Sequence, residues 1–397
     1  MLTNENIICI SWIDWEPIPL VMHQMMTRLA KKNRVLFVNH TYPLSLFITC
    51  PKMSENLWQK LKKWRSGVKQ VTNNLHTYTP PPLLMDCGYS GINDQFNQAY
   101  IKNSILKVAR KLKFKSPILW IYNPYAIYPK GKFDEKLVCY DCNDDMASLL
   151  SRFQYKKRNL RRIEEKFVKR ADIVFTTSQT LYQSKKNINP NTYYFPSGID
   201  VEVFSKALSP FTKIPIEMQS IKKPIVGFIG GMVSSKMNWD WIEKLSRSLP
   251  YLSITLVGPE TEPAPSKIKG LPNVYFLGAK PFHNLPEYLK AFDVGIIPYK
   301  EGEFLRNCFP TKIFEYFAAG KPVVSADIPA LRGLQPLVRL CKASDEFVAS
   351  VESFIKKGYS NEQKTRCIDL STKYTWDERV KKTSALINDL LSKKSFL

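Results

Sequence analysis

The sequence has no long apolar run. Among its 397 residues, no uninterrupted apolar stretch approaches the roughly 18 residues that a membrane-spanning helix needs. The N-terminal segment MLTNENIICISW also lacks a basic region before its short apolar run, so no signal peptide is predicted. We therefore expect a cytoplasmic protein.

The sequence also lacks low-complexity tracts and internal repeats. With 44% apolar and 23% charged residues, its composition is that of a globular protein. A chain of this length can form two domains that each bury a full core. A disordered or repeat architecture is therefore excluded.

Metal-ligand spacing is missing too. The eight cysteines are scattered, and only Cys139 and Cys142 have CxxC spacing, without a second CxxC or a His pair at zinc spacing. There is no convincing D-x-D motif, and Glu260 and Glu262 form the nearest acid-x-acid pair in a C-terminal loop. We expect reduced thiols, no metal site and no resident cofactor.

Acidic residues are few relative to basic ones. The chain has 58 Lys and Arg against 35 Asp and Glu, a formal charge of +23, and residues 1–204 hold 30 of the basic and 16 of the acidic residues. Such a charge favours an anionic surface or polymer. Nucleic acid and membrane both qualify, but no RRM, KH or helix-turn-helix signature accompanies the charge, so nucleic acid is the less favoured partner.

Short apolar runs alternate with helical patterns along the chain, which predicts an α/β fold with parallel sheets. The expected strands are residues 7–10, 35–38, 118–121, 137–141, 173–177, 192–195, 225–229, 254–257, 274–277, 294–297 and 322–325. Prolines at 210 and 215 indicate an interdomain connection. We predict an N-terminal domain over residues 1–204, a linker over 205–222, a C-terminal domain over 223–374 and a final helix over 375–397.

The stretch NCFPTKIFEYFAAGKPVVS, residues 307–325, has the pattern of a helix followed by a strand. Pro310 and Thr311 suit a first helical turn and Gly320 suits the end of the helix. Lys312 opposes the helix dipole and Glu315 lies among apolar neighbours, so neither fits a purely structural helix. A nucleoside diphosphate explains both, because a lysine attracts phosphate and a carboxylate accepts hydrogen bonds from ribose hydroxyls.

A second candidate phosphate contact follows the strand at 225–229. Gly230 and Gly231 come directly after it, and Lys236 lies on the same loop. Glycines at the carboxyl end of a strand allow the backbone to approach a phosphate. The alternative is a solvated loop lysine.

These motifs resemble the C-terminal domain of GT-B glycosyltransferases, in particular the large retaining group with a paired-glutamate E-x7-E motif. Glu315 matches the second glutamate, which holds the donor ribose in that family, and Asn307 occupies the position of the first. In the family pattern G-R-L-x-x-x-K, Gly230 and Lys236 keep the spacing and Gly231 replaces the arginine. The segment FLGAKPFHNLPEYLKAFDVGIIPY is also similar, and there the backbone around Gly278 would face the nucleobase.

The resemblance implies two Rossmann-like domains that face each other across a cleft. It implies retaining transfer of a sugar from a nucleoside-diphosphate sugar, for which we expect UDP, to a glycan or lipid-linked acceptor. The variant with Asn, Pro and Lys before E-Y-x-A-A-G-K-P-V resembles the subgroup of bacterial cell-surface polysaccharide transferases, such as those of teichuronic acid. The final helix would cross back to the first domain.

The acceptor side has weaker candidates. By strand order, the segment LVCYDCNDD puts Asp141 where the resembled family often has a histidine, with Asp144 nearby, and both are candidate catalytic residues. Capping of the next helix by Asn143 or Asp144 is the alternative. Three further residues are acceptor-side candidates. Asp14 and Trp15 could form a sugar-binding lip or a packed plug, and the third is His40.

Residues 57–68 predict an amphipathic helix with Leu57, Leu61, Trp64 and Val68 on one stripe, Lys60 and Arg65 along its flanks, and Lys62 and Lys63 facing away. Such a helix can lie in a membrane interface, with Trp58, Lys60, Trp64 and Arg65 as surface candidates, or pack on the protein. Basic stretches at 102–115 and 152–170 favour the peripheral membrane position on the inner face of the cytoplasmic membrane.

Two other functions stay open: an epimerase or hydrolase acting on a UDP-sugar, and a non-enzymatic basic adaptor for membrane or nucleic acid.

Overall fold

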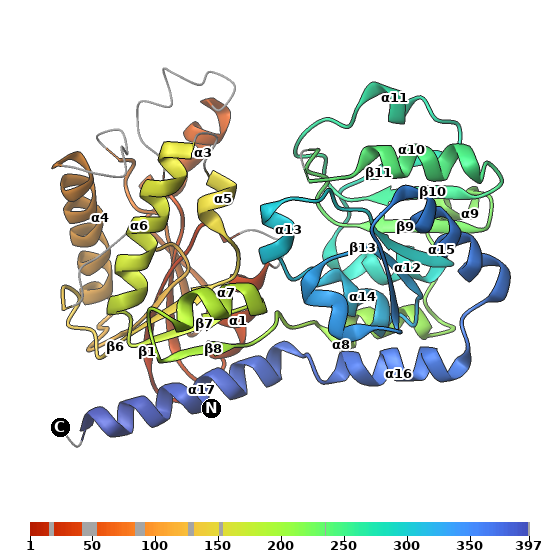
Figure 1. Ribbon diagram of the computed structural model, residues 1–397. Coiled ribbons are helices and arrows are strands. Elements are labelled where there is room, and N and C mark those ends of the chain that lie inside the picture. Colours follow the sequence, from red (N-terminus) through yellow and green to blue (C-terminus); the bar gives the residue numbers. More distant parts are fainter. Residues whose placement is uncertain are drawn as a thin grey trace. The chain divides into compact units, whose positions relative to one another are not determined.

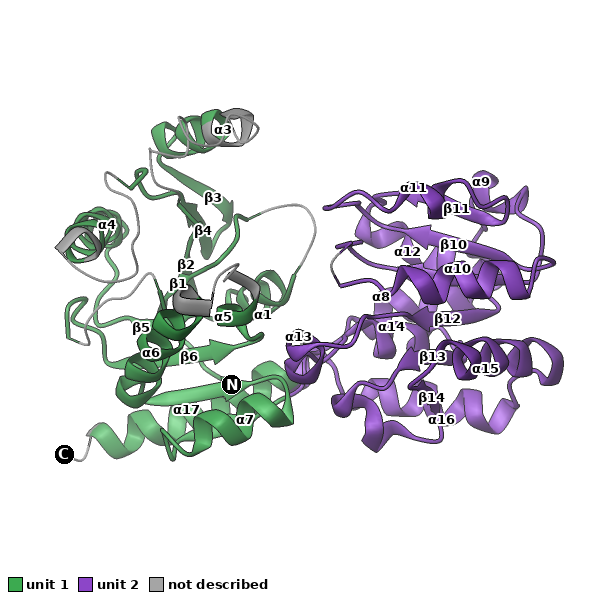
Figure 2. Ribbon diagram, turned by 45° about the horizontal axis from the view of Figure 1, so that its top comes forward, with its two compact units in different colours: residues 1–195, 379–397 green, residues 196–378 purple. Residues whose placement is uncertain are grey.

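The computed structural model describes residues 1–15, 20–41, 54–83, 92–125, 131–150, 154–234 and 236–395. The chain forms two compact units, residues 1–195 with 379–397 and residues 196–378 (Figure 2). Each unit is built on one sheet of mainly parallel strands with helices packed against it (Figure 1). The α/β prediction with two Rossmann-like domains is confirmed.

The first unit has an eight-stranded sheet in the order β3-β4-β2-β1-β5-β6-β7-β8. All neighbouring strands are parallel except β3, which runs antiparallel to β4 at the sheet edge. The strands are β1 Asn6–Ile10, β2 Arg34–Val38, β3 Val68–Thr72, β4 Leu75–Tyr78, β5 Ile118–Ile121, β6 Leu137–Cys142, β7 Ile173–Thr176 and β8 Thr192–Tyr194. The helices are α1 Val21–Leu29, α3 Ser54–Arg65, α4 Ile92–Lys111, α5 Met146–Leu150, α6 Gln154–Arg170, α7 Gln179–Lys186 and most of α17 Trp376–Ser395.

Strands β5 and β6 are buried along their whole length because helices cover the sheet. This burial explains why they are continuous apolar runs that could be found in the sequence. Helices α4 and α6 pack on the same face, since Ile105 and Val168 join one buried cluster with Tyr140. Strand β3 was not predicted, because four of its five residues are exposed and three of these are polar.

The second unit has a six-stranded parallel sheet in the order β11-β10-β9-β12-β13-β14. Its strands are β9 Ile225–Ile229, β10 Ser253–Val257, β11 Val274–Gly278, β12 Val294–Ile297, β13 Val323–Ala326 and β14 Val338–Cys341. The α-helices are α8 Val201–Phe204, α9 Ile216–Gln219, α10 Trp239–Ser248, α11 Ser266–Lys269, α12 Leu285–Ala291, α13 Glu303–Asn307, α14 Lys312–Ala318, α15 Ser344–Lys357 and α16 Asn361–Thr372. Short 3-10 helices are η2 Ser205–Leu208, η3 Phe282–Asn284 and η4 Pro329–Leu334.

Side chains of the second sheet point alternately into two separate cores. Ile225 and Ile229 join the core that α12, α14 and α16 cover, whereas Val226 and Phe228 join the core under α10 and α15. This alternation along a single strand is the expected result of the two-residue period of β structure. The unit is therefore a three-layer sandwich with a helix layer on each face.

The boundary between the units differs from the predicted one. Residues 196–204 were assigned to the N-terminal domain and 205–222 to a linker, but Phe204, Ala207, Met218 and Ile221 are buried in a core of the second unit. The segment is therefore part of that unit, because its apolar side chains need the core for burial. The final helix α17 begins in the second unit at Trp376 and belongs to the first from Arg379 onward.

None of the helices within the described ranges combines the length and the apolar character that crossing a membrane requires.

Candidate nucleotide-sugar site

Strand β9 marks the point in the second sheet where the strand order reverses. Its neighbours are β10 on one side and β12 on the other, so the chain leaves β9 toward one edge and later returns toward the opposite edge. In open parallel sheets, ligands bind outside the carboxyl ends of the strands at such a point. Gly230 is the first residue after β9 and lies at this point.

Gly230 and Lys312 are in contact there. A Cβ atom on Gly230 would lie 3.1 Å from Cε and 3.3 Å from Nζ of Lys312. Gly230 also has φ 146°, a backbone conformation that favours glycine. The two phosphate contacts predicted from separate parts of the sequence are thus neighbours in the fold.

The Lys312 ammonium is held by two aromatic rings. Its Nζ donates a hydrogen bond of 2.6 Å to the hydroxyl of Tyr299 and lies 5.0 Å from the centre of that ring and 5.3 Å from the Phe228 ring. Burial opposes the charge, but Tyr299 and Glu315 outweigh it and raise the pKa of Lys312. Lys312 is therefore protonated at neutral pH and available to an anion.

Glu315 lies one helical turn after Lys312 on α14. Its side chain is half-buried, and its carboxylate has no hydrogen bond or ion pair with any residue that the structure describes. Burial raises the pKa of Glu315 to about 7, although the charge of Lys312 lowers it. A half-buried carboxyl group with no hydrogen-bond partner in the described part of the chain suits a ligand that brings hydroxyl donors.

Two further glycines follow the neighbouring strands. Gly258, after β10, has φ 146°, and a Cβ there would lie 2.0 Å from the carbonyl oxygen of Gly230. Its N–H donates to the carbonyl oxygen of Gly278, which ends β11 with φ 69°. Three adjacent strands therefore end in glycine, which leaves backbone without side chains along this edge. Neither Gly258 nor Tyr299 was predicted as a site residue; the only signal in the sequence is that Gly258 directly follows β10 and Tyr299 lies two residues after β12.

The remaining donor-side candidates lie around this centre. Gly231 is exposed, and a Cβ there would meet no atom within 4 Å, so space is open where the resembled family has an arginine. Lys236 lies on the loop after β9, and its carbonyl oxygen accepts a hydrogen bond of 2.7 Å from the N–H of Lys300, next to Tyr299. The other candidates are Asn307, the last residue of α13, and Pro310 and Thr311, which directly precede α14 instead of forming its first turn.

Asp141 has a structural environment that does not suit the predicted catalytic role. Its side chain is fully buried, accepts a hydrogen bond of 2.7 Å from Arg379 and accepts another of 3.3 Å from the indole of Trp120. Burial raises the pKa of Asp141 and the charge of Arg379 lowers it. A carboxylate enclosed in this way cannot face an acceptor, so we correct this prediction.

The segment after Asp141 contains three polar residues with different roles. Asp145 caps α5, because its carboxylate accepts hydrogen bonds from the N–H and the hydroxyl of Ser148. The expected caps were Asn143 or Asp144. Asp144 is half-exposed, and the buried amide atoms of Asn143 have no hydrogen-bond partner among the described residues. Asn143 and Asp144 thus present polar groups at the carboxyl end of β6.

Asp14 and Trp15 do not form an open sugar-binding lip. Asp14 is buried and forms ion pairs with Lys60 and, at 2.9 Å, with Lys63 of α3. The Trp15 ring packs edge-on against His23 and Phe37, with centres 4.9 and 5.0 Å apart. These contacts correspond to the packed plug that was the alternative prediction.

His40 lies two residues after β2 and is in contact with Lys60 of α3. Burial, with a contribution from Lys60, lowers the pKa of His40 to about 4, so His40 is neutral at pH 7 and a weak base. Lys63 was expected to face away, but it binds Asp14, and Lys60 also donates to the carbonyl oxygen of His40. Two of the lysines on this helix are thus engaged by the protein.

The other candidates for membrane contact on α3 differ in how far their side chains are exposed. Trp58 is 58% exposed and Arg65 is exposed, whereas Trp64 is half-buried. The Leu57 side chain lies outside the described residues. A membrane-facing stripe on α3 is therefore reduced to a few residues.

Comparison with known proteins bears on the second unit most directly. Residues 223–356 match the family model described as Glycosyl transferases group 1. A protein of Bacillus subtilis (strain 168), named as a teichuronic acid biosynthesis glycosyltransferase, TuaH, is 27% identical over 254 residues. That match covers 60% of this chain and 63% of TuaH, which is less than two thirds of that relative.

Solved structures share the fold over the whole chain. Sucrose-phosphate synthase from Thermosynechococcus elongatus has a TM-score of 0.70 at 12% identity and covers 98% of this chain and 100% of its own. Anabaena HepE in complex with UDP has a TM-score of 0.65 at 14% sequence identity. The catalytic domain of starch synthase IV from Arabidopsis thaliana, bound to ADP and acarbose, has a TM-score of 0.65 at 13% sequence identity. Each of these matches covers 98% of this chain and 100% of the solved chain. The second unit therefore carries a group 1 glycosyltransferase domain, and the chain has the fold of the GT-B glycosyltransferases.

Proposed function

We propose that the protein is a metal-independent glycosyltransferase that uses a nucleoside-diphosphate sugar, with UDP as the nucleotide, and passes the sugar to a glycan or lipid-linked acceptor. The observation that carries this proposal is the pair formed by the protonated Lys312 and the open carboxyl group of Glu315 beside glycine-lined strand ends. The complexes of HepE with UDP and of starch synthase IV with ADP support a nucleotide in this fold.

Transfer requires the bond between the anomeric carbon and the diphosphate oxygen to break while a bond to the acceptor oxygen forms. Negative charge then develops on the leaving diphosphate, and the acceptor proton must go to a nearby oxygen. Lys312 and Lys236 would stabilise that charge, and the backbone at Gly230 would allow close approach of the phosphates. Glu315 would accept hydrogen bonds from the ribose, and the family resemblance supports retention of anomeric configuration.

The acceptor would bind to the first unit at the carboxyl end of β6. Asn143 offers a buried amide without a partner among the described residues, and Asp144 offers a half-exposed carboxylate. An amide and a carboxylate together can both donate to and accept from sugar hydroxyls. The name of the Bacillus relative supports a surface polysaccharide as the acceptor.

Nucleotide binding tests the proposed function directly. UDP at 100 times its Kd should raise the melting temperature of the purified protein by about 5–10 °C, since a ligand of the native state stabilises it. A panel of UDP, GDP, ADP and TDP, each with and without sugar, identifies the base by the largest shift. Replacement of Glu315 by Ala should weaken UDP binding by about 10–100-fold, because a hydrogen-bonded charged group is lost.

The pH dependence of the same binding provides the control. Glu315 has a pKa of about 7, so it ionises and becomes the stronger acceptor as pH rises from 6 to 8. Affinity for UDP-glucose should rise over this range in the native protein and stay flat in Glu315→Gln. Unchanged affinity in Glu315→Ala would rule out the ribose role, and a folded protein that binds no nucleotide would favour the adaptor. Sugar conversion without an acceptor would favour an epimerase or hydrolase.

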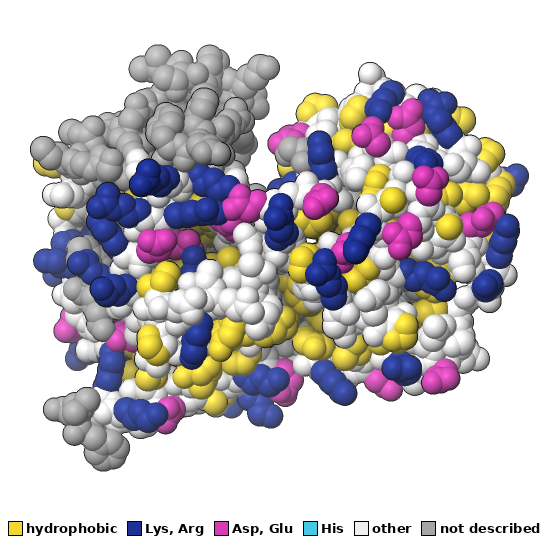
Figure 3. All heavy atoms as spheres, in the orientation of Figure 1, with side chains coloured by type: hydrophobic (Ala, Val, Ile, Leu, Met, Phe, Trp, Pro, Cys, Tyr) yellow, Lys and Arg dark blue, Asp and Glu magenta, His cyan; other side chains and the backbone are white. Residues whose placement is uncertain are grey.

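A basic surface on the first unit supports a position at an anionic membrane. Lys and Arg side chains gather over α4 and α6 (Figure 3). Arg158, Arg162 and Lys166 are exposed, recur every four residues along α6 and form no ion pair with the described residues. We propose that this surface, with little contribution from α3, contacts lipid phosphates.

Vesicle binding tests the membrane proposal. The native protein should co-sediment with vesicles containing phosphatidylglycerol at low salt and dissociate as salt is raised, because salt screens the attraction. Changing Arg158, Arg162 and Lys166 to Gln should weaken binding about 100-fold, at about 1 kcal/mol for each charge. The matched control changes the exposed Arg247, Lys356 and Lys357 of the second unit to Gln. Equal loss in both triple variants would contradict a specific surface, and binding to RNA alone would favour nucleic acid.

A further inference from the structure

The two most exposed large apolar side chains in the described part of the chain belong to one short segment of the second unit. Phe211 is 90% exposed, and Ile216, the first residue of α9, is 86% exposed. Leu208, at 38%, is a third apolar residue of this segment, which we call the apolar loop, residues 208–216. Five residues of chain span at most about 18 Å, so Phe211 and Ile216 lie close together. Exposed apolar residues that occur as a group mark an interaction site.

Hydrogen bonds fix the turn that carries Phe211. The ammonium of Lys290, on α12, donates to three carbonyl oxygens of the turn, those of Ser209 at 2.7 Å, Pro210 at 3.3 Å and Thr212 at 2.7 Å. The hydroxyl of Thr212 also donates to the carbonyl oxygen of Lys206 at 2.6 Å. The backbone is thus held on both sides of Phe211 in a conformation that leaves the ring in solvent. Because burial of such a ring is favourable, a partner that covers it is indicated.

Cations outnumber acids around the apolar loop, in the segment 202–223 and on α12. Two ion pairs of this region cancel, Lys280 with Glu217 at 2.7 Å and Lys223 with Asp293 at 3.0 Å. The cations that form no ion pair with any described residue are Lys206, Lys213, Lys222 and Lys290. The acids of which the same is true are Glu202 and Glu287. The excess of positive charge favours an anionic partner.

Lys321, after α14, lies in the same positive field. Its ammonium donates to the carbonyl oxygen of Lys290 at 3.1 Å. Burial lowers the pKa of Lys321 to about 8, with smaller contributions in the same direction from Lys223, Lys364 and Lys290 and an opposite one from Asp293. Lys290 also holds the turn at Phe211, so the positive field extends to the apolar loop.

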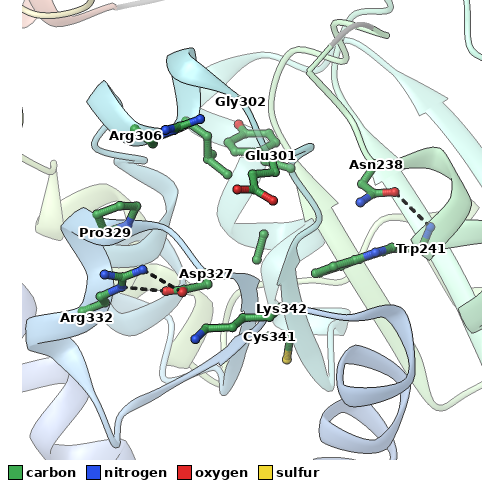
Figure 4. Close-up of a pocket in the computed structure, with 13 residues that line it drawn as sticks. Asn238, Trp241, Glu301, Gly302, Arg306, Asp327, Pro329, Arg332, Cys341 and Lys342 are labelled. Carbon is green, nitrogen blue, oxygen red and sulfur yellow. Dashed lines mark hydrogen bonds and ion pairs between the residues drawn. The ribbon is translucent and has the colours of Figure 1, made fainter.

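The charge excess does not extend over the whole second unit. At the pocket beside the carboxyl ends of β12, β13 and β14, Glu301 and Asp327 face Arg332 and Lys342, and the other cation there, Arg306, has a partner (Figure 4). The charges of that pocket therefore balance. The apolar loop differs from it in combining exposed apolar side chains with uncompensated cations.

The size of the apolar group favours a lipid surface over a protein partner. Three side chains of this kind bury less than about 600 Å² together, whereas a stable protein interface takes about 800 Å² from each partner. An anionic bilayer needs no such area. Its phosphates attract lysines, and its headgroup and acyl boundary accepts a few aromatic and branched side chains.

We propose that the apolar loop inserts into the surface of an anionic lipid bilayer. Phe211 and Ile216 then lie at the acyl boundary, and the lysines that contact lipid phosphates are Lys206, Lys213 and Lys222. This contact goes beyond the proposed function, because it belongs to the second unit and depends neither on the basic surface of α6 nor on sugar transfer.

A fluorescent probe at position 211 tests the insertion directly. The full-length Phe211→Trp variant is mixed with saturating phosphatidylglycerol vesicles whose acyl chains carry bromine, which quenches an indole in contact with it. We expect quenching of the added indole, measured as the difference from the native protein. The matched control is Pro263→Trp, at an exposed position after β10 and so at the carboxyl ends of the strands, where no added quenching is expected.

Vesicle affinity measures how much the apolar loop contributes. The double variant Phe211→Ser with Ile216→Ser should bind phosphatidylglycerol vesicles about 10–100-fold more weakly, because two apolar side chains no longer leave water. Val71→Ser, which changes an exposed apolar residue of β3, should bind like the native protein. Changing Lys206, Lys213 and Lys222 to Gln should weaken binding about 100-fold. A native melting temperature and a native shift with UDP show that each variant is folded.

Three results would overturn the inference. These are no more quenching at position 211 than at position 263, native vesicle affinity in the double Ser variant, and a dimer in lipid-free analytical ultracentrifugation that this variant loses, which would identify a second copy as the partner. The variant of the α6 surface is measured in the same assay. Native affinity in that variant together with quenching at position 211 would contradict the surface of the first unit and support the apolar loop, so the two failures are distinguishable.

Discussion

Replacement of Arg379 by Ala is expected to lower the free energy of unfolding by about 3–5 kcal/mol. Arg379 is 3% exposed and donates to the Asp141 carboxylate at 2.7 Å and to the carbonyl oxygen of Phe195 at 2.7 Å. Removal of the guanidinium strands the Asp141 charge in a buried site. The charge that lowers the pKa of Asp141 is lost with it, so the carboxyl group would protonate at a higher pH.

Chemical denaturation measures this effect, and two variants control it. Lys382→Ala changes an exposed cation on the same helix and should alter the free energy of unfolding by less than about 0.5 kcal/mol. The double variant Asp141→Asn with Arg379→Met should be less destabilised than Arg379→Ala, because no buried charge is left without its partner. If the free energy of unfolding of Arg379→Ala were within about 1 kcal/mol of the native value, the ion pair would not be what holds α17 to the first sheet.

The ion pair between Asp141 and Arg379 is a contact that could not be predicted from the sequence. Asp141 and Arg379 are 238 positions apart, and no local pattern joins an aspartate at a strand end to an arginine in the last helix. The family position alone suggested catalysis for Asp141. The burial of Asp141, which depends on the whole fold, indicates a structural role instead.

Most strands could be predicted because they are buried on both faces. Strands such as β5 and β12 are short apolar runs that only a covered parallel sheet requires. The strands that were missed are β3, β4 and β14, and both β3 and β14 lie at sheet edges, where polar residues such as Arg339 interrupt the pattern. Edge exposure thus removes the signal on which the prediction depends.

The donor-side centre could be predicted in part, because its residues cluster in the sequence. Lys312 and Glu315 are three residues apart on one helix, and Gly230 follows a clear strand. Tyr299 and Gly258 come from other strand ends, and their meeting with these residues follows from the strand order. A sequence pattern shows the strands but not which of them become neighbours.

Replacement of Lys312 by Met should lower the rate of sugar transfer by about 10²–10³-fold, which corresponds to about 2.7–4 kcal/mol of transition-state stabilisation. Lys312 is protonated and fixed by Tyr299, so it is positioned before charge develops on the diphosphate. Its contribution is greatest in the transition state, and kcat should therefore fall more than KM rises. The measurement is the release of UDP from the nucleotide sugar that gives the largest melting shift.

Two variants separate this role from simple packing. Tyr299→Phe keeps the ring under the ammonium and removes only the hydroxyl that accepts its hydrogen bond, so we expect a loss of about tenfold or less. Lys357→Met changes an exposed lysine of the same unit and should leave the rate unchanged. If Lys312→Met retained the native kcat while it still bound the donor, the diphosphate charge would have to be stabilised by Lys236 and the backbone at Gly230, and Lys312 would serve only to support the packing of Phe228 and Tyr299.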